Sequence, residues 1–243
     1  MIVRRTARFL GALLLTSWAL LLGAAAPSAL ADPCPDVEVV FARGTGEAPG
    51  VGGIGQAFVD EVRSQVGGRT VAVYPVNYAA SSDFGDRIQF ATSVIDGIRD
   101  AGTHLESTAA NCPNTRMVLG GFSQGAAVAG YVTAAVVPDG IPAEFRAFVP
   151  NPMPPEVADH VAAVALFGKP SAQWLGDVGA PPIVIGPLYV PKTTDLCIAD
   201  DTICNGAGAG PPNFAHTLYA ANGLTAQAAT FAAERLQPVT PAA

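Results

Sequence analysis

Short runs of apolar, largely β-branched residues recur along the chain and alternate with longer segments that mix apolar and polar residues. Runs of this kind are typical of strands whose two faces are both covered by other elements. They predict five strands, over Val37–Phe41, Val71–Val76, Met117–Phe122, Val161–Phe167 and Ile183–Val190.

Amphipathic segments with helical spacing lie between these runs. Apolar residues recur at every fourth position over Ile54–Val66, and a longer apolar stripe over Ile88–Cys112 predicts a second helix. Further helices are predicted over Gly125–Val136 and within the closing stretch Leu218–Leu236. Strands that alternate with helices indicate an α/β fold, a three-layer sandwich around a central, mostly parallel sheet.

The first 31 residues carry the features of a secretory signal peptide. Three arginines precede an apolar run over Phe9–Ala26, and Ala29-Leu30-Ala31 offers the small-x-small pattern that signal peptidase cleaves. We therefore expect a secreted protein that is cleaved near Ala31. The alternative is an uncleaved membrane anchor, because an apolar run of this length is at the margin for spanning a bilayer.

The remaining chain has the composition of a folded, acidic domain. We expect one domain over residues 32–237 and a disordered tail over residues 238–243. The chain is 50% hydrophobic and 14% charged, which argues against a disordered or fibrous protein. The leader removes three of the 13 basic residues and no acidic one, so 10 Lys and Arg face 20 Asp and Glu. Such a surface repels phosphate groups, which argues against nucleic acids and anionic membranes as partners.

All four cysteines lie in the part that would be exported. An even number of cysteines in an oxidising compartment favours disulfides, and we expect the pairs Cys34–Cys112 and Cys197–Cys204. A zinc site is the alternative, but no second close Cys or His has the spacing that zinc ligands show. We therefore expect neither a metal nor another cofactor.

The segment Gly121-Phe122-Ser123-Gln124-Gly125 is the strongest chemical signal in the chain. A nucleophilic serine at a strand-to-helix corner needs little bulk two residues to either side, which explains the two glycines. The start of the following helix would offer the Gln124 N–H to an oxyanion. The alternative is a serine that only caps a buried helix.

A serine nucleophile requires a base, and the chain contains three histidines. His104 lies in the long amphipathic helix and is expected to be a solvated surface residue. His160 ends a proline-rich run before a strand and is expected to be exposed. His216 follows the Gly/Pro-rich loop Gly206–Pro212 and precedes the last helix, so it is the preferred base.

The third member of a triad is an acid that orients the imidazole. In α/β-hydrolases this acid lies between the serine and the histidine in the sequence. Asp200 and Asp201 fit this order, and both lie inside the loop Cys197–Cys204. Spacing alone does not choose between them.

Taken together, four motifs resemble those of the cutinases and cutinase-like serine esterases, including secreted proteins of mycobacteria and related actinobacteria. The motifs are Phe41-Ala42-Arg43-Gly44-Thr45, Cys112-Pro113, Gly120-Gly121-Phe122-Ser123-Gln124-Gly125, and Cys197-x3-Asp201-x2-Cys204 followed by His216. The resemblance implies a lidless α/β-hydrolase fold with the triad Ser123, Asp201 and His216. The chain agrees in having no long apolar insertion between strands that is expected to form a lid.

The resemblance also implies an oxyanion hole made by the backbone N–H groups of Thr45 and Gln124, with the Thr45 hydroxyl as a third donor. Fungal cutinases usually have Ser at the position of Thr45, so this residue is a modest departure. Phe84, Phe122 and Phe214 are candidates for lining the acyl groove.

These features predict a secreted serine esterase that hydrolyses carboxylic esters of short- to medium-chain fatty acids through an acyl-enzyme on Ser123. The alternatives are an acetyl esterase acting on polysaccharide and a catalytically silent surface protein or antigen on the same scaffold. We expect a monomer that needs only a lipid-like ester as its partner, without nucleic acid or an obligate protein partner.

Overall fold

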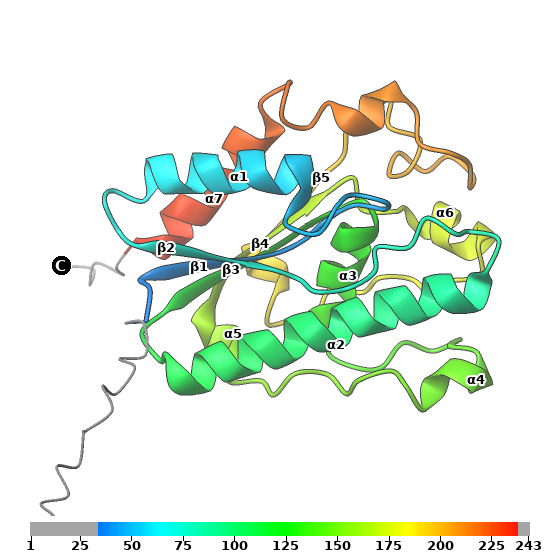
Figure 1. Ribbon diagram of the computed structural model, residues 1–243, viewed down its shortest axis with the longest axis horizontal. Helices are drawn as coiled ribbons and strands as arrows, with labels where there is room; N and C mark the ends of the chain where they lie inside the picture. Colours follow the sequence, from blue (N-terminus) through cyan, green and yellow to red (C-terminus); the bar gives the residue numbers. More distant parts are fainter. Residues whose placement is uncertain (1–33, 238–243) are drawn as a thin grey trace, which may run out of the picture. The chain divides into compact units, whose positions relative to one another are not determined.

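A sheet of five parallel strands forms the centre of the molecule, here described from a computed structural model that covers residues 34–237 (Figure 1). Its order is β2-β1-β3-β4-β5, and every neighbouring pair is parallel. The strands are β1 (Val37–Ala42), β2 (Val71–Pro75), β3 (Arg116–Phe122), β4 (Val161–Phe167) and β5 (Thr193–Leu196). The signal peptide and the tail that the sequence predicts lie outside the described residues.

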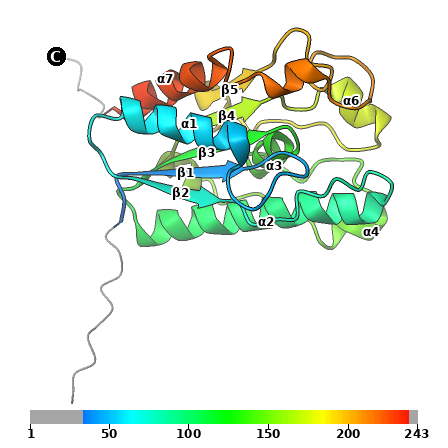
Figure 2. The ribbon, with the colours of Figure 1, turned by 45° about the horizontal axis from the view of Figure 1, so that its top comes forward.

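Helices cover both faces of the sheet, as Figure 2 shows. On one face lie α1 (Gly52–Gln65) and α7 (Leu224–Leu236), which pack against each other. On the other face lie α2 (Arg87–Asn111), α3 (Gln124–Val132) and the short α5 (Val157–His160). The short helices α4 (Ala143–Arg146), α6 (Ala172–Asp177), η1 (Val190–Lys192) and η2 (Phe214–Thr217) lie in the connections.

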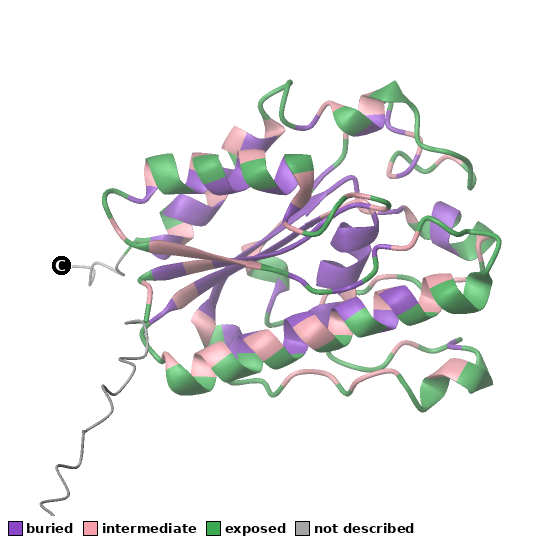
Figure 3. Ribbon diagram, in the orientation of Figure 1, coloured by how far each residue is buried: buried purple, intermediate pink, exposed green. Residues whose placement is uncertain are grey.

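The central strands are buried on both faces, which explains their continuous apolar sequence (Figure 3). All seven residues of β4 are buried, whereas the edge strand β2 is only half-buried. This three-layer arrangement confirms the predicted α/β sandwich, and the sheet is parallel throughout.

One strand prediction is wrong. The run Ile183–Val190 does not pair with the sheet, and the fifth strand is Thr193–Leu196. The run contains Pro187 and follows Pro181-Pro182, and a proline has no N–H to donate to a central ladder. Its apolar residues instead pack beside α3, where Ile183 lies over Gly130, or remain exposed.

Two helix boundaries also differ from the prediction. The helix α3 ends at Val132 rather than Val136, because the chain turns there and the Gly186 N–H donates to the Thr133 carbonyl at 3.0 Å. The last helix begins only at Leu224, after Gly223 adopts a φ of 81°, a conformation that favours glycine.

Both disulfides join the cysteines that the sequence pairs. Cys34–Cys112 ties the start of β1 to the end of α2, and Cys197–Cys204 closes the loop after β5. Among the helices between residues 34 and 237, none is both long and apolar enough to cross a membrane. The loops after β1, β3, β4 and β5 all lie at the carboxyl edge of the sheet, where ligands bind in open parallel sheets.

Candidate active site

Ser123 occupies the sharp turn between β3 and α3, with φ 56° and ψ −118°. This backbone conformation is strained for a residue that carries a Cβ, and such strain concentrates at functional sites. A Cβ on Gly121 would overlap the Gly125 carbonyl, and one on Gly125 would overlap the Ala42 carbonyl. The Ser123 N–H donates to the Phe167 carbonyl at 2.9 Å. The two glycines therefore permit the tight turn that exposes the serine at the edge of the sheet.

His216 lies on η2 and pairs with Asp201, because its Nδ1 is 2.8 Å from Oδ2 of the carboxylate. Only 4% of His216 and none of Asp201 is exposed. His216 and Ser123 line the same cavity, although within residues 34–237 no hydrogen bond joins the serine hydroxyl to the imidazole. With Nδ1 facing Asp201, Nε2 is the nitrogen available to a serine in this cavity.

Asp201 accepts three hydrogen bonds. Besides His216, the Tyr219 hydroxyl donates to Oδ2 at 2.6 Å and the Ile203 N–H donates to Oδ1 at 2.9 Å. Burial alone would raise the pKa of this carboxyl, but the three hydrogen bonds outweigh it and hold the pKa of Asp201 below its usual value. The ionised carboxylate is therefore suited to stabilising an imidazolium.

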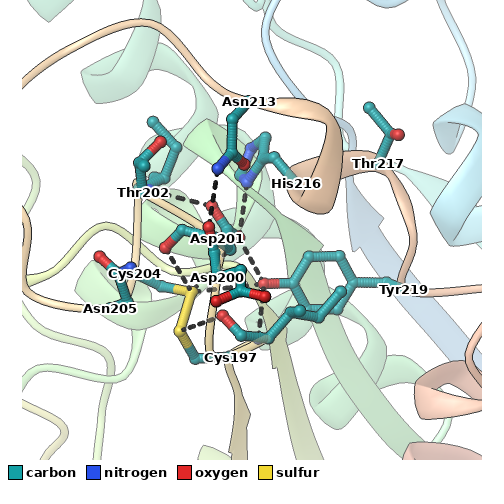
Figure 4. Close-up of polar contacts among 12 residues, drawn as sticks. Cys197, Asp200, Asp201, Thr202, Cys204, Asn205, Asn213, His216, Thr217 and Tyr219 are labelled. Carbon is teal, nitrogen blue, oxygen red and sulfur yellow. Dashed lines mark hydrogen bonds and ion pairs between the residues drawn. A yellow bond between two sulfur atoms is a disulfide. The ribbon is translucent and has the colours of Figure 1, made fainter.

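The disulfide-closed loop brings one of its two candidate acids to the histidine, as Figure 4 shows. Asp201 is fully buried and contacts His216, whereas Asp200 is exposed. The Asp200 carbonyl instead accepts a hydrogen bond from the Asn213 side-chain amide at 2.7 Å. The geometry thus leaves Asp200 outside the group of residues around the imidazole.

Tyr219 and Gly168 are two residues of this group that the sequence analysis missed. Tyr219 is fully buried. Burial is the main cause that raises the pKa of its hydroxyl, and the nearby Asp201 raises it further, so the hydroxyl remains a neutral donor. Gly168 has φ 57°, and a Cβ there would lie 2.9 Å from the Tyr219 hydroxyl and 3.0 Å from Cε1 of His216. Neither residue lies in a local motif, so only the fold reveals them.

The loop after β1 is held by a network that the sequence analysis also missed. Arg43 is buried, and its guanidinium donates to the Tyr78 carbonyl at 2.6 Å and to the Glu47 carbonyl at 2.9 Å. The Glu47 carboxylate accepts the Gly44 N–H at 2.6 Å and the Gly53 N–H at 2.8 Å. These bonds fix the backbone on both sides of Thr45, the predicted oxyanion residue between Gly44 and Glu47.

That residue, Thr45, lines the cavity together with Ser123 and Gln124. Gln124 begins α3, and its side chain is buried and donates to the Ser81 carbonyl at 3.2 Å. The backbone N–H at the start of a helix has no partner within that helix, so the Gln124 N–H is available to a ligand. The chain therefore brings both predicted oxyanion residues to the wall of one cavity.

The arrangement matches a known family. A sequence model of the family named Cutinase matches residues 33–236. The chain belongs to the cutinase family. Among the relatives of this cutinase-family chain is "Probable carboxylesterase Culp7" of Mycobacterium tuberculosis, 61% identical over 71% of this chain and 89% of the relative.

Solved structures of fungal enzymes share the cutinase fold described above. A Trichoderma reesei cutinase in complex with a phosphonate inhibitor aligns with a TM-score of 0.61 and 28% identity, over 85% of this chain and 79% of that chain. The catalytic core domain of an acetyl xylan esterase from Trichoderma reesei aligns with a TM-score of 0.65 and 25% identity, over 83% and 99% of the two chains.

The cavity of this cutinase-family protein has a volume of about 1060 Å³. Phe84 and Phe122 line it, as the sequence suggests, and the Phe122 ring packs 4.8 Å from the imidazole of His216. Phe214 is 77% exposed and is not among the residues that line the cavity, so its assignment to the acyl groove lacks structural support.

One wall of the cavity comes from residues 134–153, the connection between α3 and α5. The sequence indicates no long apolar insertion between strands that would form a lid, and this connection is a wall of the cavity that the sequence pattern did not predict. Apolar residues of this connection, among them Ile141, Phe145 and Met153, line the cavity together with residues of α2. They are separated by prolines and polar residues, so no periodic pattern marks them in the sequence.

The other two histidines lie apart from Ser123. His104 was expected to be solvated, but it is stacked on the Tyr74 ring with centroids 3.4 Å apart, and its Nε2 is 3.0 Å from Oε2 of Glu38. His160 is half-buried at the end of α5 rather than exposed. Within residues 34–237, no group of three or more His, Cys, Asp or Glu side chains has a geometry that would hold a metal.

Proposed function

We propose that this protein is a secreted serine esterase that hydrolyses carboxylic esters of fatty acids through an acyl-enzyme on Ser123. One observation carries the proposal: the buried pair of His216 and Asp201 opens onto the cavity that also contains the strained Ser123. Membership of the cutinase family and the relative named a probable carboxylesterase support ester hydrolysis as the reaction.

In the proposed mechanism, the Ser123 hydroxyl attacks the ester carbonyl while Nε2 of His216 accepts its proton. Asp201 stabilises the imidazolium, and the backbone N–H groups of Thr45 and Gln124 stabilise the tetrahedral oxyanion. The imidazolium then protonates the leaving alcohol. A water molecule that is deprotonated by His216 cleaves the acyl-enzyme and releases the acid.

The substrate proposal starts from esters of short- to medium-chain fatty acids. The apolar cavity beside Ser123 supports an acyl chain as the bound group. The structural similarity to an acetyl xylan esterase favours one alternative, an acetyl esterase that acts on polysaccharide. A catalytically silent surface protein is the other alternative, and the buried, ionised Asp201 argues against it.

The test is the hydrolysis of p-nitrophenyl acetate, butyrate and octanoate by the wild type, Ser123→Ala and the control Ser64→Ala. Ser64 is an exposed serine on α1 and does not line the cavity. We expect turnover that prefers butyrate or octanoate and is abolished only by Ser123→Ala. A preference for acetate would favour the alternative of an acetyl esterase that acts on polysaccharide. Turnover that does not depend on Ser123 would reject the proposed mechanism.

Secretion is proposed from the predicted leader and from the two disulfides, which are typical of oxidising compartments. Expression of the full chain in an actinobacterial host, followed by N-terminal sequencing, tests it. We expect a mature protein that begins near Asp32. An intact N-terminus in the membrane fraction would instead support the uncleaved anchor.

A further inference from the structure

One wall of the cavity contains a short segment whose polar groups bond mostly to one another. This flap, residues 141–149, includes the helix α4. The Phe145 N–H donates to the Pro142 carbonyl at 2.9 Å, and the Val149 N–H donates to the Phe145 carbonyl at 3.2 Å. Nε of Arg146 donates to the Ile141 carbonyl at 3.0 Å. The flap is therefore a local unit that draws little polar support from the rest of the molecule.

A single polar contact joins the flap to the remainder of the described chain. The guanidinium of Arg99 on α2 donates to the Phe148 carbonyl at 2.5 Å. Among residues 34–237, no other hydrogen bond or ion pair connects residues 141–149 with the rest of the molecule. Figure 1 shows α4 beside α2, the helix that carries this arginine. The bond between Arg99 and Phe148 is thus in a position to hold the flap closed.

The apolar attachment of the flap is also small. Of its residues only Ile141 is buried, and Phe148 is 61% exposed. Ile141, Phe145 and Val149 line the cavity, so one side of each faces open space rather than packed side chains. Segments with few buried apolar contacts open locally at a low cost in free energy.

The chain on either side of the flap is suited to act as a hinge. Gly140 has φ 82°, and a Cβ built on it would meet no atom within 4 Å. On the other side, Pro150-Asn151-Pro152 contains two residues without a backbone N–H, and within residues 34–237 no hydrogen bond involves this tripeptide. Hinges are commonly a few positions beside an element that absorb its change in backbone angles.

We propose that the flap is a gate of the Ser123 cavity, which opens to admit the acyl group of an ester, closes over it and is latched by Arg99. The inference rests on the proposed function, because the admitted group is the one that Ser123 would bind. The flap and Ser123 line the same cavity, so a closed flap limits the access of water to the bound group. The gate is a short part of the cavity wall and not an inserted lid.

Limited proteolysis with trypsin measures the opening of the gate. Arg146 is the only Lys or Arg in the flap, and a detached helix of four residues is too short to stay folded, so cleavage after Arg146 reports the open flap. The variant Arg99→Met removes the donor, and Arg63→Met is its matched control. Arg63 pairs with Asp60 on α1 as Arg99 pairs with Asp96 on α2, but it makes no bond to the flap.

Two further samples keep the test decisive. Ile141→Ala removes the one buried side chain of the flap, so it should open the gate even if Arg99→Met does not fold. The wild type is also treated with p-nitrophenyl phosphonates that carry either an octyl or a methyl group, and Ser123 displaces p-nitrophenolate from the phosphorus of each. An octyl chain in the cavity contacts the closed flap, whereas a methyl group does not extend to it. A ligand that binds the closed state lowers the population of the open one.

We expect cleavage after Arg146 to be about tenfold faster in Arg99→Met than in the wild type, because a hydrogen bond from a charged donor contributes about this factor. Ile141→Ala should act in the same direction, and Arg63→Met should match the wild type. The octyl group on Ser123 should slow cleavage at least about tenfold, which corresponds to two buried methylenes, and the methyl group should not.

Equal cleavage after Arg146 in the wild type, Arg99→Met and Ile141→Ala would overturn the gate, and so would a failure of the octyl group to protect this bond. Neither result bears on the chemistry of Ser123. Failure of both phosphonates to modify Ser123 would instead reject the proposed function.

Discussion

The Tyr219 hydroxyl donates a hydrogen bond of 2.6 Å to Oδ2 of Asp201, the same oxygen that lies 2.8 Å from Nδ1 of His216. The carboxylate oxygen that orients the imidazole is thus itself held by a buried phenol. Tyr219 is fully buried, and its ring packs edge-on against Phe167, so the hydroxyl has a fixed position. This relationship makes Tyr219 a positioning residue for the proposed base.

We expect Tyr219→Phe to lower kcat/KM about tenfold, because a hydrogen bond to a charged group contributes about 1.5 kcal/mol at the low end of its range. The hydrogen bond from Tyr219 is one of those that lower the pKa of Asp201, so the variant raises that pKa. The carboxylate then becomes protonated at a higher pH, and the acid limb of the pH profile of kcat/KM should move upward.

Tyr74→Phe is the matched control, since the Tyr74 hydroxyl donates to the Asp100 carboxylate at 3.1 Å but does not line the cavity. It should change stability without moving the pH profile. If both variants moved the profile equally, Tyr219 would have only a structural role.

We expect Gly168→Ala to reduce activity by at least about 100-fold, since a small misplacement of catalytic groups has an effect of this size. The added Cβ would lie 2.9 Å from the Tyr219 hydroxyl, 3.0 Å from Cε1 of His216 and 3.1 Å from Oδ2 of Asp201. Gly67 has a similar φ, 65°, and no atom within 4 Å of such a Cβ. Gly67→Ala therefore carries the same backbone strain, and it should lower the melting temperature while activity at room temperature is retained.

Glu47→Gln should lower kcat more than it changes KM. The substitution replaces one carboxylate oxygen with an amide N–H, which cannot accept the N–H of Gly44 or Gly53. Loosening this loop displaces the Thr45 N–H, and the loss of one oxyanion donor typically costs about 100- to 1,000-fold. Steady-state kinetics on p-nitrophenyl butyrate measure the effect, with the exposed Glu234→Gln as the control. Equal kinetics for the two variants would show that Glu47 does not hold an oxyanion donor.

The sequence predicts the scaffold well because its signals are local. Four strands and the two long helices α1 and α2 follow from periodicity, since a buried parallel strand and an amphipathic helix impose their own spacing on the chain. The fifth strand was misplaced because apolar composition alone does not distinguish a strand from an apolar segment broken by prolines. Thr193–Leu196 is short and partly polar, so the sequence carries little signal for it.

The candidate site likewise contains residues that a local motif predicts and residues that only the fold reveals. Ser123 is visible in the sequence because the sharp turn requires glycines at fixed spacing around it. Asp201 was separated from Asp200 only by the family resemblance. Tyr219 and Glu47 make their contacts through the fold, and no spacing rule connects a tyrosine to an aspartate 18 residues earlier.

The Cys34–Cys112 disulfide should contribute more to stability, and the Cys197–Cys204 disulfide should contribute more to activity. In the chain-entropy model, the Cys34–Cys112 bridge, with a sequence separation of 78, contributes about 4.5 kcal/mol and the Cys197–Cys204 bridge, with a separation of 7, about 2.4 kcal/mol. Loss of the long bridge in Cys34→Ala/Cys112→Ala should therefore lower the unfolding free energy more. Loss of the short bridge in Cys197→Ala/Cys204→Ala should reduce kcat more, because this loop holds Asp201 against His216.

Urea unfolding and steady-state kinetics on the two double variants separate these effects. We expect the Cys34/Cys112 variant to keep a kcat close to that of the wild type at a temperature where it is folded. The Cys197/Cys204 variant should lose at least about tenfold in kcat while still folded, because the loop that carries Asp201 and its hydrogen bond from the Ile203 N–H to Oδ1 is then no longer closed. A Cys197/Cys204 variant with normal kcat would show that the hydrogen bonds to Asp201 position the carboxylate without the disulfide.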